Sequence, residues 1–132
     1  MIYLDTSVAL AQLLSEDRRP PRSLWREDLV SSRLLQYELW TRLNARGLSR
    51  SHRFSALDLT SRVAFLELNP QVLQRALEPF PVQVRTLDAL HLASALYLLS
   101  RGQRLQMASY DDRLKTAAES VGLESVPPSD LG

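Results

Sequence analysis

The sequence contains no cysteine. This absence excludes disulfide frameworks, cysteine-ligated zinc sites and thiol catalysis, and it agrees with a cytoplasmic protein, which is the localisation that we expect. Lysine is nearly absent too, because Lys115 is the single lysine among 16 basic residues. The other basic residues are arginines, whose planar guanidinium suits two-point contact with phosphate. Codon bias of the genome is the simpler explanation of this composition.

Long apolar runs are also missing. The longest, ALHLASALYLL at residues 89–99, is far shorter than the roughly 20 residues that a membrane-spanning helix needs, so we expect it to form a buried helix. The N-terminus has no basic segment, and Asp5 interrupts its apolar stretch early, which excludes a signal peptide. We therefore expect no membrane association.

The charge balance excludes a strong overall field, because the net charge is only +1. Any binding of nucleic acid would therefore have to come from a local group of basic residues. The chain has 132 residues, 45% of them hydrophobic, which suits one globular domain, residues 1–132, with a usable core.

Short apolar runs alternate with helical segments along the chain. The expected strands are residues 2–4, 29–32, 63–68, 104–109 and 123–126. The expected helices are residues 6–14, 23–27, 33–46, 49–62, a segment starting at 69–70, 86–101 and 111–121. Strands separated by helices form βαβ units, so we predict an α/β fold, a three-layer α/β/α sandwich with a central, mainly parallel sheet. Thr86 is expected to cap its helix, and residues 127–132 to form a frayed tail.

Acidic residues fall where this fold would place a binding site. Asp5 follows the first strand directly, and the pair Asp111–Asp112 follows the strand at 104–109. Glu38 and Asp88 lie in early turns of two helices. In an open parallel sheet, ligands bind at the carboxyl ends of the strands, so all of these acids can reach one edge.

Each acid also has a simpler structural role. Asp5 and one member of the pair Asp111–Asp112 can cap the helices that follow them. Glu38 can pair with Arg42 at the i,i+4 spacing. Asp88 can interact with the positive end of its helix. Taken singly these roles are sufficient, but together they require four coincidences at one edge of the sheet.

A cluster of carboxylates favours a bound cation. Like charges held close together raise each other's pKa, and a divalent cation removes that conflict. Oxygen ligands without cysteine or histidine suit hard ions such as Mg²⁺ or Mn²⁺. Ions of this kind activate water and stabilise the leaving oxygen when phosphodiesters are hydrolysed.

Four segments together resemble a known family. They are YLDTS at residues 3–7, LLQYELWTRL at 34–43, LDALHLASAL at 87–96 and ASYDDRLKTAA at 108–118. They look like the four acidic motifs of PIN-domain ribonucleases, and most closely like those of the VapC toxins of bacterial toxin–antitoxin pairs. The resemblance implies a PIN-like fold and a Mg²⁺- or Mn²⁺-dependent endoribonuclease, the toxin of a type II toxin–antitoxin system. It also implies an RNA substrate, a homodimer and a cognate antitoxin protein that covers the acidic groove.

The resemblance carries metal binding and catalysis onto Asp5, Glu38, Asp88 and Asp111. The fourth position rests on the family's hydroxyl–any–Asp pattern, which selects Asp111 with Ser109 as the hydroxyl. Asp112 stays an alternative at that position.

Smaller polar residues of the same motifs are expected to support the acids. Thr6, Ser7 and Ser109 would orient the ligands. Arg85 is a further candidate for contact with a phosphate, with plain solvation as the equal alternative. His91 is expected to serve mainly in packing of its helix.

A second function class remains open from the sequence. A non-catalytic RNA-binding or regulatory scaffold on the same fold would keep the acids as helix caps and bind no metal tightly. A phosphotransfer enzyme that uses Asp5 as its nucleophile fits less well, because residue 7 is serine where a second aspartate is needed and Lys115 lies within a helical pattern.

Overall fold

The computed structural model describes residues 1–14 and 17–132. The strands in this part of the chain are β1 (Ile2–Leu4), β2 (Leu29–Ser32), β3 (Val63–Leu66), β4 (Gln106–Ala108) and β5 (Glu124–Ser125). The α-helices are α1 (Thr6–Leu14), α2 (Leu34–Ala45), α3 (Arg53–Ser61), α4 (Pro70–Leu77), α5 (Thr86–Ser100) and α6 (Asp112–Ser120). Two short 3₁₀ helices, η1 (Arg22–Arg26) and η2 (Pro128–Asp130), complete the structure.

The strands form one parallel sheet in the order β3-β2-β1-β4-β5. β1 lies in the middle, where Tyr3 pairs with Val30 of β2 on one side and with Met107 of β4 on the other. The chain fills one side of β1 with β2 and β3 and then returns to place β4 and β5 on the other side. The strand order therefore reverses between β1 and β4, the position where parallel sheets open a crevice for ligands.

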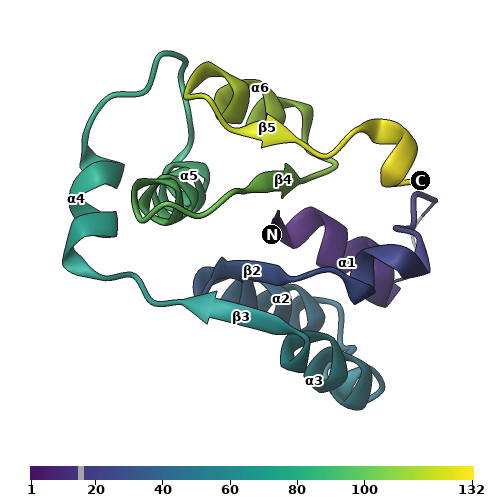
Figure 1. Ribbon diagram of the computed structural model, residues 1–132. Coiled ribbons are helices and arrows are strands. Elements are labelled where there is room, and N and C mark those ends of the chain that lie inside the picture. The colour runs from purple at the N-terminus through teal and green to yellow at the C-terminus, as the bar shows by residue number, and fades with distance from the viewer. Residues whose placement is uncertain (15–16) are drawn as a thin grey trace.

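Helices cover both faces of this sheet (Figure 1). Side chains alternate between the faces along a strand. Ile2 and Leu4 therefore pack into the core formed with α1, α2 and α3, whereas Tyr3 packs into the core formed with α5 and α6. The predicted three-layer α/β/α sandwich is confirmed.

Local signals in the sequence mark several helix ends correctly. Gly47 follows α2 with a φ of 68°, a conformation that glycine adopts without the steric penalty of a Cβ. The Asn69 side chain accepts a hydrogen bond from the amide of Val72 at 2.9 Å and so caps α4, whose first residue is Pro70. These signals act within a few residues, which is why the sequence alone reveals them.

Other boundaries differ from the prediction. The helix expected over 49–62 begins at Arg53, and residues 49–52 form turns. The last three strands are shorter than expected, because pairing with a neighbour decides where a strand ends. β5, for example, pairs with β4 only at Glu124 and Ser125.

Two predictions about the chain's later part are wrong. Thr86 does not cap α5: the cap position belongs to Arg85, without a side-chain hydrogen bond, and Thr86 is the first helical residue. The C-terminal tail is not frayed, because Leu131 is only 1% exposed and its carbonyl accepts a hydrogen bond of 2.6 Å from the Tyr110 hydroxyl. Burial of this leucine stabilises the ordered tail.

None of the helices in the described residues has the length and hydropathy needed to cross a membrane.

Candidate functional site

The ends of β1 and β4 bring two predicted site segments together. The Asp5 amide donates a hydrogen bond of 2.9 Å to the Ala108 carbonyl, so the residue after β1 lies beside the last residue of β4. Ser109 and Asp111 follow directly. This junction is the reversal point of the strand order, where the topology favours ligand binding.

Hydroxyl groups hold the Asp5 carboxylate in place. Its Oδ2 accepts hydrogen bonds from Ser7 Oγ at 2.6 Å and from Ser109 Oγ at 2.8 Å. The Ser7 amide lies 3.4 Å from the same oxygen, which is a weak form of the expected helix cap. Asp5 is only 7% exposed. All of these contacts use Oδ2, and Oδ1 accepts no hydrogen bond from the described residues.

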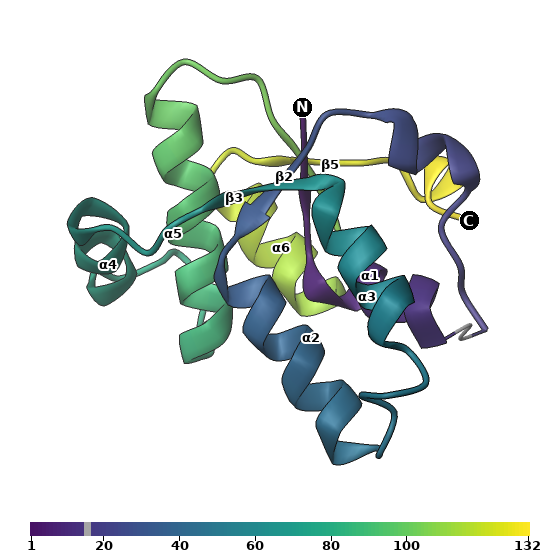
Figure 2. The same cartoon turned by 90° about the horizontal axis from the view of Figure 1, so that it is seen from below.

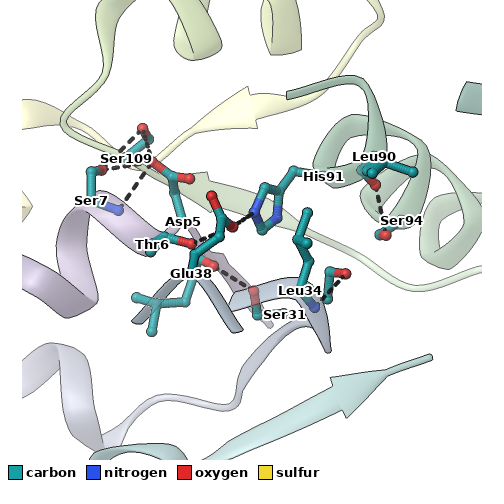
Figure 3. Close-up of polar contacts among 12 residues, drawn as sticks. Asp5, Thr6, Ser7, Ser31, Leu34, Glu38, Leu90, His91, Ser94 and Ser109 are labelled. Carbon is teal, nitrogen blue, oxygen red and sulfur yellow. Dashed lines mark hydrogen bonds and ion pairs between the residues drawn. The ribbon is translucent and has the colours of Figure 1, made fainter. Parts of the chain in front are cut away.

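Glu38 is held in a similar way from the other side of the site (Figure 3). Its Oε1 accepts a hydrogen bond from Thr6 Oγ1 at 2.9 Å and contacts His91 Nε2 at 2.6 Å. The i,i+4 pair with Arg42 is not among the ion pairs of the described residues. Thr6 follows Asp5 in sequence, so this contact links the first two acids of the motif set. Thr6, Ser7 and Ser109 thus all hydrogen-bond to the predicted acids, and their supporting role stays a prediction.

His91 connects Glu38 to the centre of the sheet. Its Nδ1 lies 2.7 Å from the hydroxyl of Tyr3 in β1, and that hydroxyl also accepts a hydrogen bond of 3.2 Å from the Ser32 amide. Because the ionised Glu38 carboxylate can only accept, Nε2 carries the proton in this contact. His91 is 1% exposed. The sequence suggested that His91 mainly packs its helix. Its contact with Glu38 means that it also fixes the orientation of that side chain.

The charges around His91 alter its protonation. Burial lowers the pKa of His91, but the hydrogen bond with Glu38 and the charges of Asp5, Glu38 and Asp88 outweigh burial, so the pKa lies above its ordinary value. The sequence signal for His91 was its position one turn after Asp88 in an otherwise apolar helix. Residues three apart share a helix face, so the face that presents Asp88 also presents His91.

Asp88 lies in the first turn of α5 and is half-buried. Burial raises the pKa of Asp88, and the nearby charges of Asp111 and Asp5 raise it further. His91 and Arg85 lower it in part. Asp5 and Asp111 therefore lie near enough for their charges to act on Asp88. Arg85 is exposed at the start of α5, close enough for its charge to act on Asp88.

The two aspartates after β4 have different surroundings. Asp111 caps α6: its Oδ1 accepts hydrogen bonds from the amides of Arg113 at 3.0 Å and Leu114 at 3.4 Å, and its own amide donates to Ser109 Oγ at 3.0 Å. The Asp112 side chain is 92% exposed and pairs with Lys115 at 3.1 Å. Asp111, rather than Asp112, is therefore the member of the pair that belongs to the hydrogen-bond network around Asp5.

The donor chemistry of this site fits a hard divalent cation. The carboxylates of Asp5, Glu38, Asp88 and Asp111 offer oxygen ligands, which Mg²⁺ and Mn²⁺ prefer. The pKa of Asp88 is raised first by burial and then by repulsion from Asp111 and Asp5, and a bound cation would relieve that repulsion. In residues 1–14 and 17–132, no three acidic or histidine side chains surround one point closely enough to hold an ion in their present positions.

Comparisons with known proteins find relatives along nearly the whole chain. The sequence profile of the PIN domain matches residues 2–120. The chain belongs to the PIN-domain family. Ribonuclease VapC46 of Mycobacterium tuberculosis is 34% identical over 97% of this chain and 98% of its own length. Ribonuclease VapC47 of the same species is 30% identical over 97% of both chains.

A solved structure supports the same fold. The crystal structure of Mycobacterium tuberculosis VapC20, described as a sarcin-ricin loop cleaving toxin, matches this PIN domain with a TM-score of 0.70. The match covers 97% of this chain and all of the other at 21% identity. The predicted PIN-like fold and the resemblance to VapC proteins are both confirmed.

Proposed function

We propose that this PIN domain is a Mg²⁺- or Mn²⁺-dependent endoribonuclease and the toxin of a type II toxin–antitoxin system. The observation that carries the proposal is that Thr6, the residue after Asp5, hydrogen-bonds to Glu38 at the reversal point of the sheet. The charge of Asp5 also acts on Asp88, which lies on a third distant segment. Full-length relatives that are VapC ribonucleases support the choice of RNA as substrate. A scaffold function does not account for the buried hydrogen bonds that orient Asp5 and Glu38.

The residues that would hold the ion are Asp5, Glu38, Asp88 and Asp111. When bound, the ion would activate water for attack on the RNA phosphate and stabilise the leaving oxygen. Ser7 and Ser109 restrain Asp5, while Thr6 and His91 restrain Glu38, so hydrogen bonds orient these two carboxylates before an ion binds. Hydrolysis of the P–O3′ bond would leave a 5′-phosphate and a 3′-hydroxyl.

The expected cellular setting follows from this activity. A toxin of this class is paired with a cognate antitoxin protein, and a segment of that partner would cover the acidic site. Both the antitoxin and the RNA substrate would be met in the cytoplasm, which agrees with the absence of cysteine. Arg85, exposed beside Asp88, would contact a phosphate of the bound RNA.

Incubation of the purified protein with total RNA tests the activity directly. We expect discrete new 5′ ends, mapped by sequencing, in the presence of Mg²⁺ or Mn²⁺. The same cuts should disappear with EDTA and in the Asp88→Ala variant, because each removes part of the metal site. Absence of cuts combined with absence of a metal-dependent thermal shift would instead support the scaffold function.

We also propose that a second copy of this chain covers an apolar face on α4 and α5. Leu73, Leu77 and Leu87 are 44%, 81% and 48% exposed on these helices. Leu73 and Leu77 line a cavity of about 610 Å³ together with Phe80 and Val82. Clusters of exposed large apolar side chains mark interaction surfaces, which supports the homodimer expected of this family.

Light scattering coupled to size-exclusion chromatography tests the dimer. Leu77→Glu should convert a dimer into a monomer, because it buries a charge in the proposed interface. The matched control is Leu57→Glu, since Leu57 is 44% exposed on α3, away from this face. A dimer that survives Leu77→Glu would contradict this interface.

A further inference from the structure

A second polar cavity lies at the far end of α1 from Asp5. It is bounded by the C-terminal end of α1, the 3₁₀ helix η1 and helix α3, and its volume is about 600 Å³. We call it the arginine cavity. Its charged lining residues are Arg19, Arg22, Arg26, Asp58 and Arg62. Positive charge thus gathers locally in a protein whose net charge is only +1.

Most of this positive charge is available for a ligand. Arg62 pairs with Asp58 at 3.4 Å, and both side chains are exposed. Arg19, Arg22 and Arg26 form no ion pair with the acids of residues 1–14 and 17–132. Guanidinium groups offer several donors in a planar fork that matches phosphate oxygens.

Other arginines of the chain are used for packing. Arg18 lies over the ring of Tyr110, Arg33 over Phe65, Arg75 over Phe80 and Arg101 over Tyr97, at 4.2–5.3 Å from the ring centres. No such stacking occurs among the described residues for the arginines of the cavity. Among the described residues, Arg19, Arg22 and Arg26 thus form neither ion pairs nor ring contacts.

Aromatic side chains also line this cavity. Trp25 lines it, and its indole Nε1–H is buried without a hydrogen-bond partner among the described residues. Buried donors of this kind are normally satisfied. His52 lies in the same lining, so the cavity combines arginines with aromatic rings, as surfaces that bind single-stranded nucleic acid do.

The cavity lies within reach of an RNA bound at the acidic site. Asp5 precedes the first turn of α1, whereas Gln12 and Leu13 near its other end line the cavity. Figure 2 shows α3 beside α1. A rise of about 1.5 Å per residue puts ~12 Å between the two ends along the helix axis. Phosphates recur about every 3.4 Å along one strand of a duplex, so the gap corresponds to a few nucleotides.

We propose that the arginine cavity binds the phosphate backbone of the RNA substrate at a point away from the cleaved bond. The inference rests on the proposed ribonuclease function. A ribonuclease must attract the phosphates of RNA, but the carboxylates of the acidic site repel phosphate and the net charge of +1 gives little attraction. Contacts in the arginine cavity would provide affinity for RNA, while the acidic site would carry out its hydrolysis.

Fluorescence anisotropy with labelled polyuridylate, in EDTA to prevent cleavage, tests this site. The triple variant Arg19→Ala, Arg22→Ala, Arg26→Ala should bind at least ~10-fold more weakly than the unmodified protein, and the slope of log K against log salt should fall by about two. The matched control replaces Arg46, Arg101 and Arg104 by alanine, which removes the same charge from exposed positions outside the cavity. The control should change affinity by less than ~3-fold.

Two outcomes would overturn the inference. Equal losses in both triple variants would mean that RNA responds only to total charge. Stronger binding of polyglutamate than of polyuridylate, lost in the cavity variant, would mean that the cavity takes an acidic peptide instead. If the cavity variant unfolds, the single variants Arg22→Glu and Arg26→Glu provide the same comparison.

Failure of the proposed function gives a different pattern. If the protein cleaves no RNA with Mg²⁺ but binds polyuridylate through the cavity, the proposed RNA-binding site stands and the proposed nuclease activity fails. If the protein cleaves RNA normally and binds it equally well after the triple replacement, the proposed nuclease activity stands and the proposed RNA-binding site fails.

Discussion

Replacement of Asp5 by asparagine should abolish cleavage of RNA while leaving the protein folded. Asparagine keeps the shape of the side chain, and its carbonyl oxygen can still accept hydrogen bonds from Ser7 and Ser109. It removes the charge that would hold the ion, so we expect the rate to fall by at least ~10³-fold, or about 4 kcal/mol of transition-state stabilisation. The measurement is the rate of appearance of the mapped 5′ ends.

The same variant separates metal binding from folding. Without metal, its free energy of unfolding should equal or exceed that of the unmodified protein, because the charge of Asp5 raises the pKa of Asp88 and so opposes its ionisation. The rise in Tm on addition of Mn²⁺ should disappear.

Asp112→Asn is the matched control for Asp5→Asn. It also exchanges one aspartate for asparagine, but at an exposed side chain that pairs with Lys115. Cleavage and the Mn²⁺-dependent rise in Tm should both be retained. Survival of both in Asp5→Asn would contradict the proposed site, whereas their loss in Asp112→Asn would reassign the fourth acid.

Replacement of His91 by alanine should reduce both stability and metal affinity. The change leaves the Glu38 carboxylate without one of its two donors and leaves the Tyr3 hydroxyl with the Ser32 amide as its remaining partner. Loss of a buried hydrogen-bonded group of this kind costs about 2–4 kcal/mol of unfolding free energy. Because Glu38 also becomes free to turn, we expect ~10–100-fold weaker metal binding in the folded protein.

His91→Gln distinguishes positioning from packing. The glutamine amide can donate to Glu38, so metal affinity should recover in part even where stability does not. Denaturation with urea reports the stability, and calorimetric titration with Mn²⁺ at low temperature reports the affinity. His52→Ala serves as the control, because His52 contacts only Ser51 among the hydrogen-bonded pairs described and should change stability by less than about 0.5 kcal/mol. Normal metal affinity in His91→Ala would show that His91 serves packing alone.

Interactions within a few residues of the chain were predictable. Asp5 falls after β1 and Asp111 after β4, because short apolar runs and helix starts are visible in the sequence. Gly47 and Asn69 ended and started helices as expected, since their effects depend on local backbone geometry. The alternation of strands and helices then implied parallel pairing and a common edge for the acids.

Contacts between distant segments were not predictable in the same way. His91 meets Glu38 across 53 positions and Tyr3 across 88, and a histidine in an apolar helix reads equally well as packing. The burial of Leu131 depends on Tyr110 and on the core around α1 and α2, so the short polar tail resembled a frayed end. Asp111 and Asp112 are adjacent in sequence, where the family's hydroxyl–any–Asp pattern favours Asp111, and the structure adds that Asp112 is the exposed member of the pair.

By itself, the sequence determined the order of elements, the parallel α/β architecture and the acids that reach the edge of the sheet. Hydrophobic periodicity and turn residues act between neighbours in the chain, so they can be recognised from the sequence alone. Only the tertiary structure decided which oxygen of each acid is restrained, that His91 orients Glu38, and that arginines gather in a cavity beyond α1. Those outcomes depend on packing, which brings together side chains that no local pattern relates.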